Sequence, residues 1–352
     1  MSIIVISGVE LCRKEISGVE RYNYEIVTRL DRLLITINAE ERPDIRICYL
    51  ADEQLQLPKL QCIRVVPLER RAARSKSKDI CDYARKNKAI LVNLAPRFIT
   101  YAKQIITLYD VRPLEKEHYD SFRYRVNFLL IRAWLKMHPG IRVVTISKYQ
   151  KRRIHSLCGI AAKRIAVIGC GWEHIDSIQS DDSVLDRLGL AKEGYYLAIG
   201  SIACHKNYEW LVRMAEKYPA EKFVIAGREN ALKGGYRLEH GNTPNLILTG
   251  YVSEEEKKAL LENCTALLHP SKYEGFGIPP LEALALGRKI AVSDVCCMKE
   301  IYRKSATYFD PDHGAISLQE IENADPEEEK KVLQKYTWEN AASGWLELLK
   351  SL

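Results

Sequence analysis

The sequence has no apolar run of about 18 residues, the length that a membrane-spanning helix needs, so we expect no such helix. Its ten cysteines include no pair at the spacing of about two to four residues that is typical of zinc sites, which excludes that class of site. It also has no internal repeat and no low-complexity tract, which excludes solenoid and disordered classes. What remains, with 47% hydrophobic and 28% charged residues, is the composition of an ordinary globular protein.

The start of the chain and its charges set expectations about location and partners. Residues 3–7 form an apolar run that polar sequence follows at once, so we expect a first strand here and not a signal peptide. Cysteines scattered singly through apolar segments indicate reduced core thiols in a cytoplasmic protein. The formal charge is +7, and basic runs over 70–78, 123–136 and 148–153 all lie in the first half. This asymmetry suggests that the first half faces something negative.

Short apolar runs, such as residues 3–7 and 195–200, alternate with helical patterns along almost the whole chain. Continuous Val/Ile/Leu runs joined by helices are typical of parallel sheets that are buried on both faces. We therefore predict an α/β protein with two Rossmann-like, doubly wound domains over 1–170 and 171–335, and a terminal helix over 336–352. Sheets of this kind bind ligands beyond the carboxyl ends of their strands.

The stretch SKYEGFGIPPLEALALG, residues 271–287, places two glutamates around a glycine turn and a predicted helix start. One interpretation is a plain strand-to-helix connection, in which the glycines serve the turn and Pro280 begins the helix. The other is a ligand site, because the turn follows a strand end and the helix would point its free N–H groups at a phosphate. Glu282, near the third helical position, would then accept hydrogen bonds from a sugar hydroxyl. The position after a strand favours the second interpretation.

This stretch fits, nearly position by position, the pattern S-x-x-E-G-F-G-x-P-x-x-E-A-x-A-x-G, and on it the chain resembles the retaining glycosyltransferases of family four. The segments GSIACHKNYEWLV (200–212) and LTGYVSEEEKKALL (248–261) are also similar, and the resemblance is strong after residue 190 and loose before it. It implies the GT-B fold, in which two Rossmann-like domains face each other and the C-terminal helix crosses back to the first domain. The first domain would lie on the acceptor side, and the second would bind a nucleotide sugar.

The resemblance implies a role for each matching residue. Glu282 would hold the ribose hydroxyls of the donor, Glu274 the donor sugar and Lys206 the diphosphate. The other implied donor-binding positions are Gly275, Phe276, Gly277, Ile278, Leu281, His205 and the first-domain glycine Gly18.

The chain departs from the family at three places. His205 precedes Lys206 where an arginine is common, and histidine lacks the bidentate fork, so a weaker or pH-dependent grip on the diphosphate is predicted. Tyr109 and Asp110 stand where many members have His-Asp; Asp110 either orients a reacting hydroxyl or caps a turn. Residues 168–171, Ile-Gly-Cys-Gly, replace the usual Pro-Asn-Gly linker.

The resemblance implies retaining transfer of a hexose from a nucleotide-diphosphate sugar to a glycan or lipid-linked sugar, in the assembly of bacterial-type surface polysaccharide. The sequence His205-Lys206-Asn207 hints at GDP-mannose-type donors, and UDP-sugars stay open. We expect no cofactor and no divalent metal, because Lys206 and the helix amides can neutralise the diphosphate. A sugar-nucleotide epimerase or a phosphorylase on the same architecture is the main alternative. A nucleic-acid-binding module is a distant one, because acids interrupt the basic runs and no RNA-recognition aromatic signature occurs.

Residues 120–138, DSFRYRVNFLLIRAWLKMH, combine large apolar side chains with four basic ones. One interpretation is a core helix whose basic side faces water. The other is a helix that docks the protein peripherally on an anionic surface, such as the inner face of a membrane.

Overall fold

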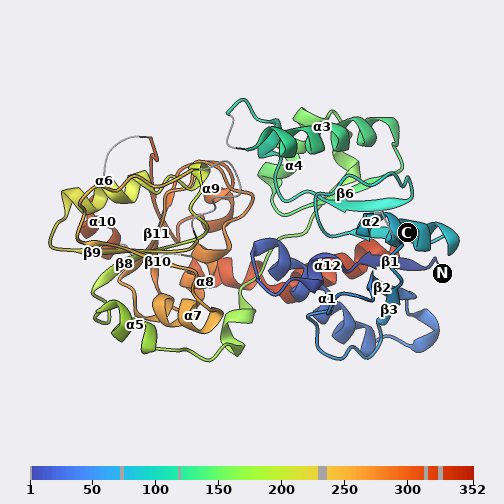
Figure 1. The fold of residues 1–352 in the computed structure, drawn as a ribbon, viewed down its shortest axis with the longest axis horizontal. Helices are drawn as coiled ribbons and strands as arrows, with labels where there is room; N and C mark the ends of the chain where they lie inside the picture. Colours follow the sequence, from blue (N-terminus) through green and yellow to red (C-terminus); the bar gives the residue numbers. More distant parts are fainter. Residues whose placement is uncertain (1, 72–74, 118–119, 229–235, 313–315, 324–327) are drawn as a thin grey trace. The chain divides into compact units, whose positions relative to one another are not determined.

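The computed structural model describes residues 2–71, 75–117, 120–228, 236–312, 316–323 and 328–352, so Arg74 of the first basic run lies outside the described residues. The chain divides into two compact units, which are described separately below (Figure 1). The first unit comprises Met1–Lys116, Phe122–Cys170 and Trp338–Leu352. The second comprises Gly171–Thr337 together with Glu117–Ser121.

The first unit is built on a seven-stranded parallel sheet. Its strands are β1 (Ile4–Ser7), β2 (Ile45–Leu50), β3 (Arg64–Leu68), β4 (Ile90–Asn93), β5 (Gln104–Thr107), β6 (Arg142–Thr145) and β7 (Ile165–Val167). The spatial order is β3-β2-β1-β4-β5-β6-β7, and Ile4 lies opposite both Ile45 and Ile90. The chain therefore winds outward from β1 in one direction and then, from β4, in the other.

The helices of the first unit are α1 (Gly18–Ile35), α2 (Lys76–Lys86), α3 (Phe122–Met137), α4 (Lys148–Cys158) and α12 (Trp338–Lys350). Ser17 and Glu20 form a capping box that fixes the start of α1. α1 packs along α12, where Trp345 Nε1 donates to the Tyr22 hydroxyl at 2.9 Å and that hydroxyl donates to the carbonyl of Ile168 at 3.2 Å. The last helix is thus anchored in the core of the first unit.

The second unit is built on a six-stranded parallel sheet. Its strands are β8 (Tyr195–Ile199), β9 (Lys222–Ala226), β10 (Leu246–Gly250), β11 (Ala266–His269), β12 (Lys289–Ser293) and β13 (Thr307–Phe309), in the order β10-β9-β8-β11-β12-β13. Its helices are α5 (Ser183–Leu188), α6 (Glu209–Lys217), α7 (Glu254–Asn263), α8 (Ile278–Ala285), α9 (Met298–Tyr302), α10 (Leu318–Glu322) and α11 (Glu329–Lys335). The sequence-based prediction of an α/β protein with two doubly wound parallel sheets is therefore confirmed.

The central strands of both sheets are buried, which explains their runs of Val, Ile and Leu. All four residues of β1 and all five of β8 are buried. In the second unit the core cluster joins Trp210 of α6 to Phe309 of β13, whose rings stack with their centroids 4.2 Å apart. Within the described residues, no helix combines the length and the apolar character that crossing a bilayer requires.

Candidate functional site

The sheet of the second unit brings Lys206 and Glu274 together. Lys206 ends a short 3₁₀ helix, Cys204–Lys206, that follows β8, and Glu274 lies in the turn that follows β11. β8 and β11 are neighbours in the sheet, and the winding direction reverses between them. At such a reversal the two connections leave the sheet on opposite sides, which opens the crevice where doubly wound sheets bind ligands. Both residues therefore lie at the position where a ligand is expected.

Three donors converge on one carboxylate oxygen of Glu274. Its Oε1 lies 2.6 Å from Lys206 Nζ, 2.9 Å from His269 Nε2 and 2.8 Å from the Ser271 hydroxyl, which donates to it. Lys206 and Glu274 are only 15% and 13% exposed, so the ion pair is poorly screened by water. The turn thus holds a fixed negative charge directly beside a fixed positive one.

The surroundings keep this carboxylate ionised. Burial alone would raise the pKa of Glu274, but the Lys206 charge and the His269 hydrogen bond outweigh it and hold the pKa well below its usual value. Burial lowers the pKa of His269, despite the opposing influence of Glu274. At neutral pH, His269 is therefore a neutral imidazole next to the ionised Glu274. Its Nε2 carries the proton and donates the hydrogen bond to the carboxylate.

The turn between β11 and α8 depends on Gly277. Its φ of +89° is strained for other residues, and an added Cβ would lie 3.1 Å from Met298 Cε. The hydroxyl of Tyr302 donates to the carbonyl of Gly277 and fixes the turn from the side of α9. The predicted donor-binding residues Gly275 and Phe276 are buried in this same turn.

Helix α8 begins at Ile278, two residues before the predicted start at Pro280. The prediction used only Pro280 as the first helical residue, but a first turn tolerates both Pro279 and Pro280, because its N–H groups have no intrahelical partner. Of the four N–H groups that a helix start normally leaves unpaired, the two prolines remove two. The remaining donors are the amides of the N-cap Gly277 and of Ile278. Leu281, which the resemblance also implied, is the fourth helical residue, and its N–H pairs inside the helix with the carbonyl of Gly277. Glu282 is consequently the fifth helical residue and not near the third, as was predicted.

Glu282 is buried and paired, with its side chain 3% exposed. Its Oε1 lies 2.7 Å from His174 Nε2 and 2.9 Å from Lys257 Nζ. Burial alone would raise the pKa of Glu282, but the Lys257 charge and the His174 hydrogen bond lower it far below the usual range. Lys257 also contacts Glu254 of α7 at 3.0 Å. Within the described residues no hydrogen bond reaches Oε2 of Glu282, so this is the oxygen available to a ligand hydroxyl.

The residue after Lys206 ties the strand ends together. Asn207 is buried in the left-handed conformation, with φ +55°, and its Nδ2 donates to the carbonyls of Pro270 at 3.1 Å and Pro311 at 3.0 Å. The carbonyl of His205 accepts the N–H of Lys272 at 2.8 Å. The half-buried His205 side chain is thereby held next to Lys206, on the loop that leaves β8.

The expectation of metal-free chemistry overlooked an Asp-x-Asp sequence, Asp310-Pro311-Asp312, which follows β13. Its central carbonyl accepts from Asn207, so it lies beside the loop that carries Lys206. Asp312 Oδ1 is 2.7 Å from Lys272 Nζ, and Asp310 Oδ1 accepts the N–H of Asp312 at 2.9 Å. A lysine ammonium thus neutralises one of these two carboxylates.

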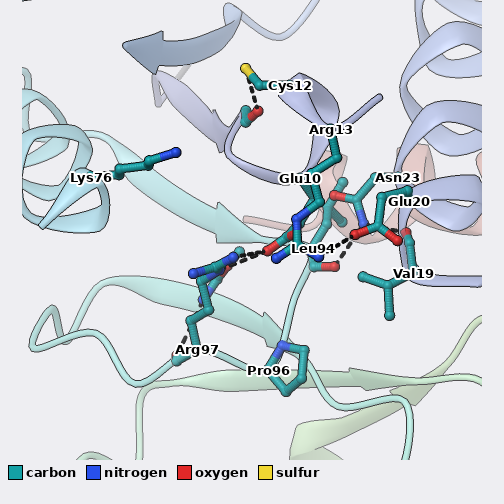
Figure 2. Close-up of polar contacts among 12 residues, drawn as sticks. Glu10, Cys12, Arg13, Val19, Glu20, Asn23, Lys76, Leu94, Pro96 and Arg97 are labelled. Atoms are coloured by element: carbon teal, nitrogen blue, oxygen red, sulfur yellow. Dashed lines mark hydrogen bonds and ion pairs between the residues drawn. The ribbon is translucent and has the colours of Figure 1, made fainter. Parts of the chain in front are cut away.

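In the first unit, Gly18 is the exposed first residue of α1, at the equivalent reversal between β1 and β4. Figure 2 shows a chain of ion pairs across this point: Arg97, after β4, donates from Nε to Glu10 at 2.7 Å. Arg13 Nε lies 3.1 Å from Glu10, and its Nη1 lies 2.9 Å from Glu20. Two carboxylates and two guanidiniums therefore fasten the loop that leads into α1.

Asp110 and Tyr109 also belong to the first unit. Asp110 Oδ1 accepts the N–H of Arg112 at 3.1 Å, which is the turn-capping contact of the plainer interpretation. The hydroxyl of Tyr109 donates to the carbonyl of Leu94 at 2.6 Å and accepts from Asn23 at 3.2 Å. Burial raises the pKa of Tyr109 well above its ordinary value, so its hydroxyl stays neutral and occupied within the unit.

The sequence analysis missed four side chains that set the charge of the two glutamates. Ser271 is the first residue of the motif and His269 lies two residues before it, so their positions, three and five residues before Glu274, were a usable signal. His174 and Lys257 lie far from Glu282 in sequence, on different elements, and only folding brings them to it.

The fold agrees with comparisons to known proteins. The structure of HepE from Anabaena in complex with UDP-glucose has a TM-score of 0.71 over the full length of both chains, at 14% identity, which shows the GT-B fold. Residues 185–321 match the family "Glycosyl transferases group 1", and this part of the chain is a domain of that family.

Two relatives extend the comparison. The O-antigen chain mannosyltransferase RfbU of Salmonella typhimurium is 30% identical over 59% of this chain, and the chain spans only 57% of its length. The O-antigen chain mannosyltransferase B of Escherichia coli is 23% identical over 99% of this chain and 100% of its own.

Proposed function

We propose that the protein is a retaining, metal-independent glycosyltransferase that moves a hexose, with mannose from GDP-mannose favoured, to a glycan or lipid-linked acceptor during surface polysaccharide assembly. The observation that carries this proposal is the contact between Lys206 and Glu274 at the sheet reversal, next to the first turn of α8. The names of the two relatives, both O-antigen chain mannosyltransferases, support the choice of sugar.

The site suits the departure of a nucleotide diphosphate. As the bond from the anomeric carbon to the leaving oxygen breaks, negative charge grows on the diphosphate and positive charge on the sugar. Lys206 and the first-turn amides of Gly277 and Ile278 stabilise the first, and the ionised Glu274 stabilises the second. The departing diphosphate oxygen takes the proton of the acceptor hydroxyl, which attacks from the same face. No protein nucleophile is required in this scheme.

The proposal is tested on the purified full chain by thermal shift with GDP, UDP and ADP, followed by product analysis with the preferred donor. We expect GDP to raise the melting temperature most, and the mannoside product to keep the α configuration of the donor by NMR. An inverted product would contradict retention, and preference for UDP would contradict the donor. Release of an epimerised sugar nucleotide, or of a sugar phosphate made from free phosphate, would favour the epimerase or phosphorylase alternatives.

Excess EDTA should leave the transfer rate within about twofold of its value with Mg²⁺ present, because Lys206 and the helix amides supply the charge that a metal would otherwise provide. Initial rates after exhaustive dialysis against EDTA measure this. The contrary result is that EDTA abolishes activity and Mn²⁺ restores it. If Mn²⁺ then failed to restore activity in Asp312→Asn, the transfer would depend on a cation bound by Asp310 and Asp312.

Glu282→Gln should weaken binding of both the donor and the bare nucleotide diphosphate by about 10–100-fold, since a charged acceptor is lost at the ribose. Calorimetry with GDP measures the change. Glu254→Gln is the matched control, because it removes the other carboxylate on Lys257, and we expect it to bind GDP normally. If Glu282→Gln and Glu254→Gln weakened GDP binding equally, the cause would be the charge of Lys257 and not a contact of Glu282 with ribose.

A further inference from the structure

Helix α3 exposes its apolar side chains. Of the eleven large hydrophobic side chains that are exposed among the described residues, five lie on this one helix of 16 residues. They are Phe122 (81% exposed), Tyr124 (37%), Leu129 (50%), Leu130 (46%) and Met137 (64%). Scattered exposed apolar residues are normal, but a concentration of this kind marks an interaction surface.

Four of the five exposed side chains, with the half-buried Val126 and the exposed Ala133, form one stripe along the helix, which we call the outer stripe: Phe122, Val126, Leu129, Leu130, Ala133 and Met137. These positions are separated by three, four or one residues, the spacing of a single helical face. Tyr124 lies outside the outer stripe, next to Phe128, with the two ring centroids 5.1 Å apart. The opposite face, with Phe128, Ile131 and Leu135, is buried in the core of the first unit against α4. The sequence alone allowed two interpretations of residues 120–138. The first, a core helix whose basic side faces water, is incomplete, because the side of α3 that faces water is mainly apolar.

Basic residues border the outer stripe on both sides. At 100° per residue, Arg123 lies along one edge and Arg125, Arg132 and Lys136 lie along the other. The helix carries no acidic residue, and none of these four basic side chains forms an ion pair with an acid in the described part of the chain. Figure 1 shows α3 at the periphery of the first unit, on the side of the sheet away from α1 and α12.

We propose that α3 docks the first unit on an anionic lipid surface, with the outer stripe in the interfacial region and the bordering basic side chains on lipid phosphates. Charge complementarity favours an anionic lipid surface as the partner, because an apolar stripe flanked only by basic side chains is typical of a helix that lies in a membrane interface. A second copy of the chain would instead bring four positive charges against four others. This docking goes beyond the transfer reaction and does not depend on it, because lipid binding requires no donor.

The test is co-sedimentation of the full chain with phosphatidylglycerol–phosphatidylcholine vesicles, and with phosphatidylcholine vesicles alone, at low and high salt. We expect binding only to the anionic vesicles, and weaker binding at high salt. The double variant Arg123→Gln/Arg125→Gln should lower the partition coefficient about 30-fold, and Leu129→Ser/Leu130→Ser about tenfold or more. The controls Lys330→Gln/Lys331→Gln, two exposed lysines of the second unit, and Val65→Ser should bind like the unaltered protein.

Three results would overturn the proposal. They are equal partition into both kinds of vesicle, normal binding by both double variants, and a dimer in size-exclusion chromatography that Leu129→Ser/Leu130→Ser dissociates while no form binds vesicles. Because all four altered side chains are at least partly exposed, the variants should keep the melting temperature of the unaltered protein, and this is checked first.

Discussion

Replacing Glu274 by glutamine should slow sugar transfer from bound donor by about 10²-fold or more, while the affinity for the bare nucleotide diphosphate stays nearly unchanged. Glutamine keeps the shape and offers Lys206 an oxygen, but it removes the negative charge that His269, Ser271 and Lys206 now hold in place. That charge matters most when the anomeric carbon becomes positive, so the loss is expected in the transition state. Single-turnover rates and calorimetry with GDP separate the two quantities.

Two comparisons sharpen this result. Ser271→Ala removes one donor to Glu274 and keeps the charge, so its rate should lie between those of the unaltered protein and Glu274→Gln. Glu193→Gln, an exposed carboxylate paired with Arg288, should be silent. If Glu274→Gln lost nucleotide affinity as strongly as Glu282→Gln and kept its turnover, the two glutamates would have to exchange roles.

Replacing Lys206 by methionine should lower turnover by about 10²–10³-fold, because one fixed donor to the developing charge is lost in a site that largely excludes water. Unlike Glu274→Gln, it should also weaken binding of the bare nucleotide diphosphate, by about tenfold, since the diphosphate is already charged before transfer. Steady-state kinetics and calorimetry with GDP measure both effects.

Lys258→Met is the matched control for Lys206→Met. Lys258 is 13% exposed and contacts Glu262 at 3.5 Å, so its replacement also removes a poorly exposed ammonium from an ion pair, but away from the motif. The Lys206→Met/Glu274→Gln double variant should lose much less activity than the product of the single losses, because the two side chains act as a contacting pair. Fully multiplicative losses, or a normal rate in Lys206→Met, would contradict the proposed arrangement.

The part of the site that lies within one short stretch of sequence could be predicted, and the part assembled across the sheet could not. The glycine turn, the helix that follows it and the free amides at the start of that helix are local features, set by backbone chemistry. Even there, two consecutive prolines left the first helical residue ambiguous, and the choice of Pro280 moved Glu282 by two positions. His174 and Lys257 make Glu282 a buried ion pair through contacts that no spacing in the sequence encodes.

Helix α3 shows a second limit of prediction from sequence, which concerns the face of a helix that is buried. Its sequence is apolar nearly all round, so periodicity alone could not say which side faces the sheet. Packing decides this: Phe128, Ile131 and Leu135 meet the core, and the outer stripe is what remains. The α/β class, in contrast, follows from the many buried strands, and one uncertain boundary does not change it.

The amide of Asn207 joins loops that follow three different strands, because the chain that leaves β8 is bonded to the carbonyls of Pro270, after β11, and Pro311, after β13. Its left-handed backbone and near-complete burial leave it little freedom to move. The position of the preceding Lys206 is therefore settled during folding and not when a ligand arrives. The entropy cost of ordering this cation has already been met when a diphosphate binds, so more of the attraction between them is available as affinity.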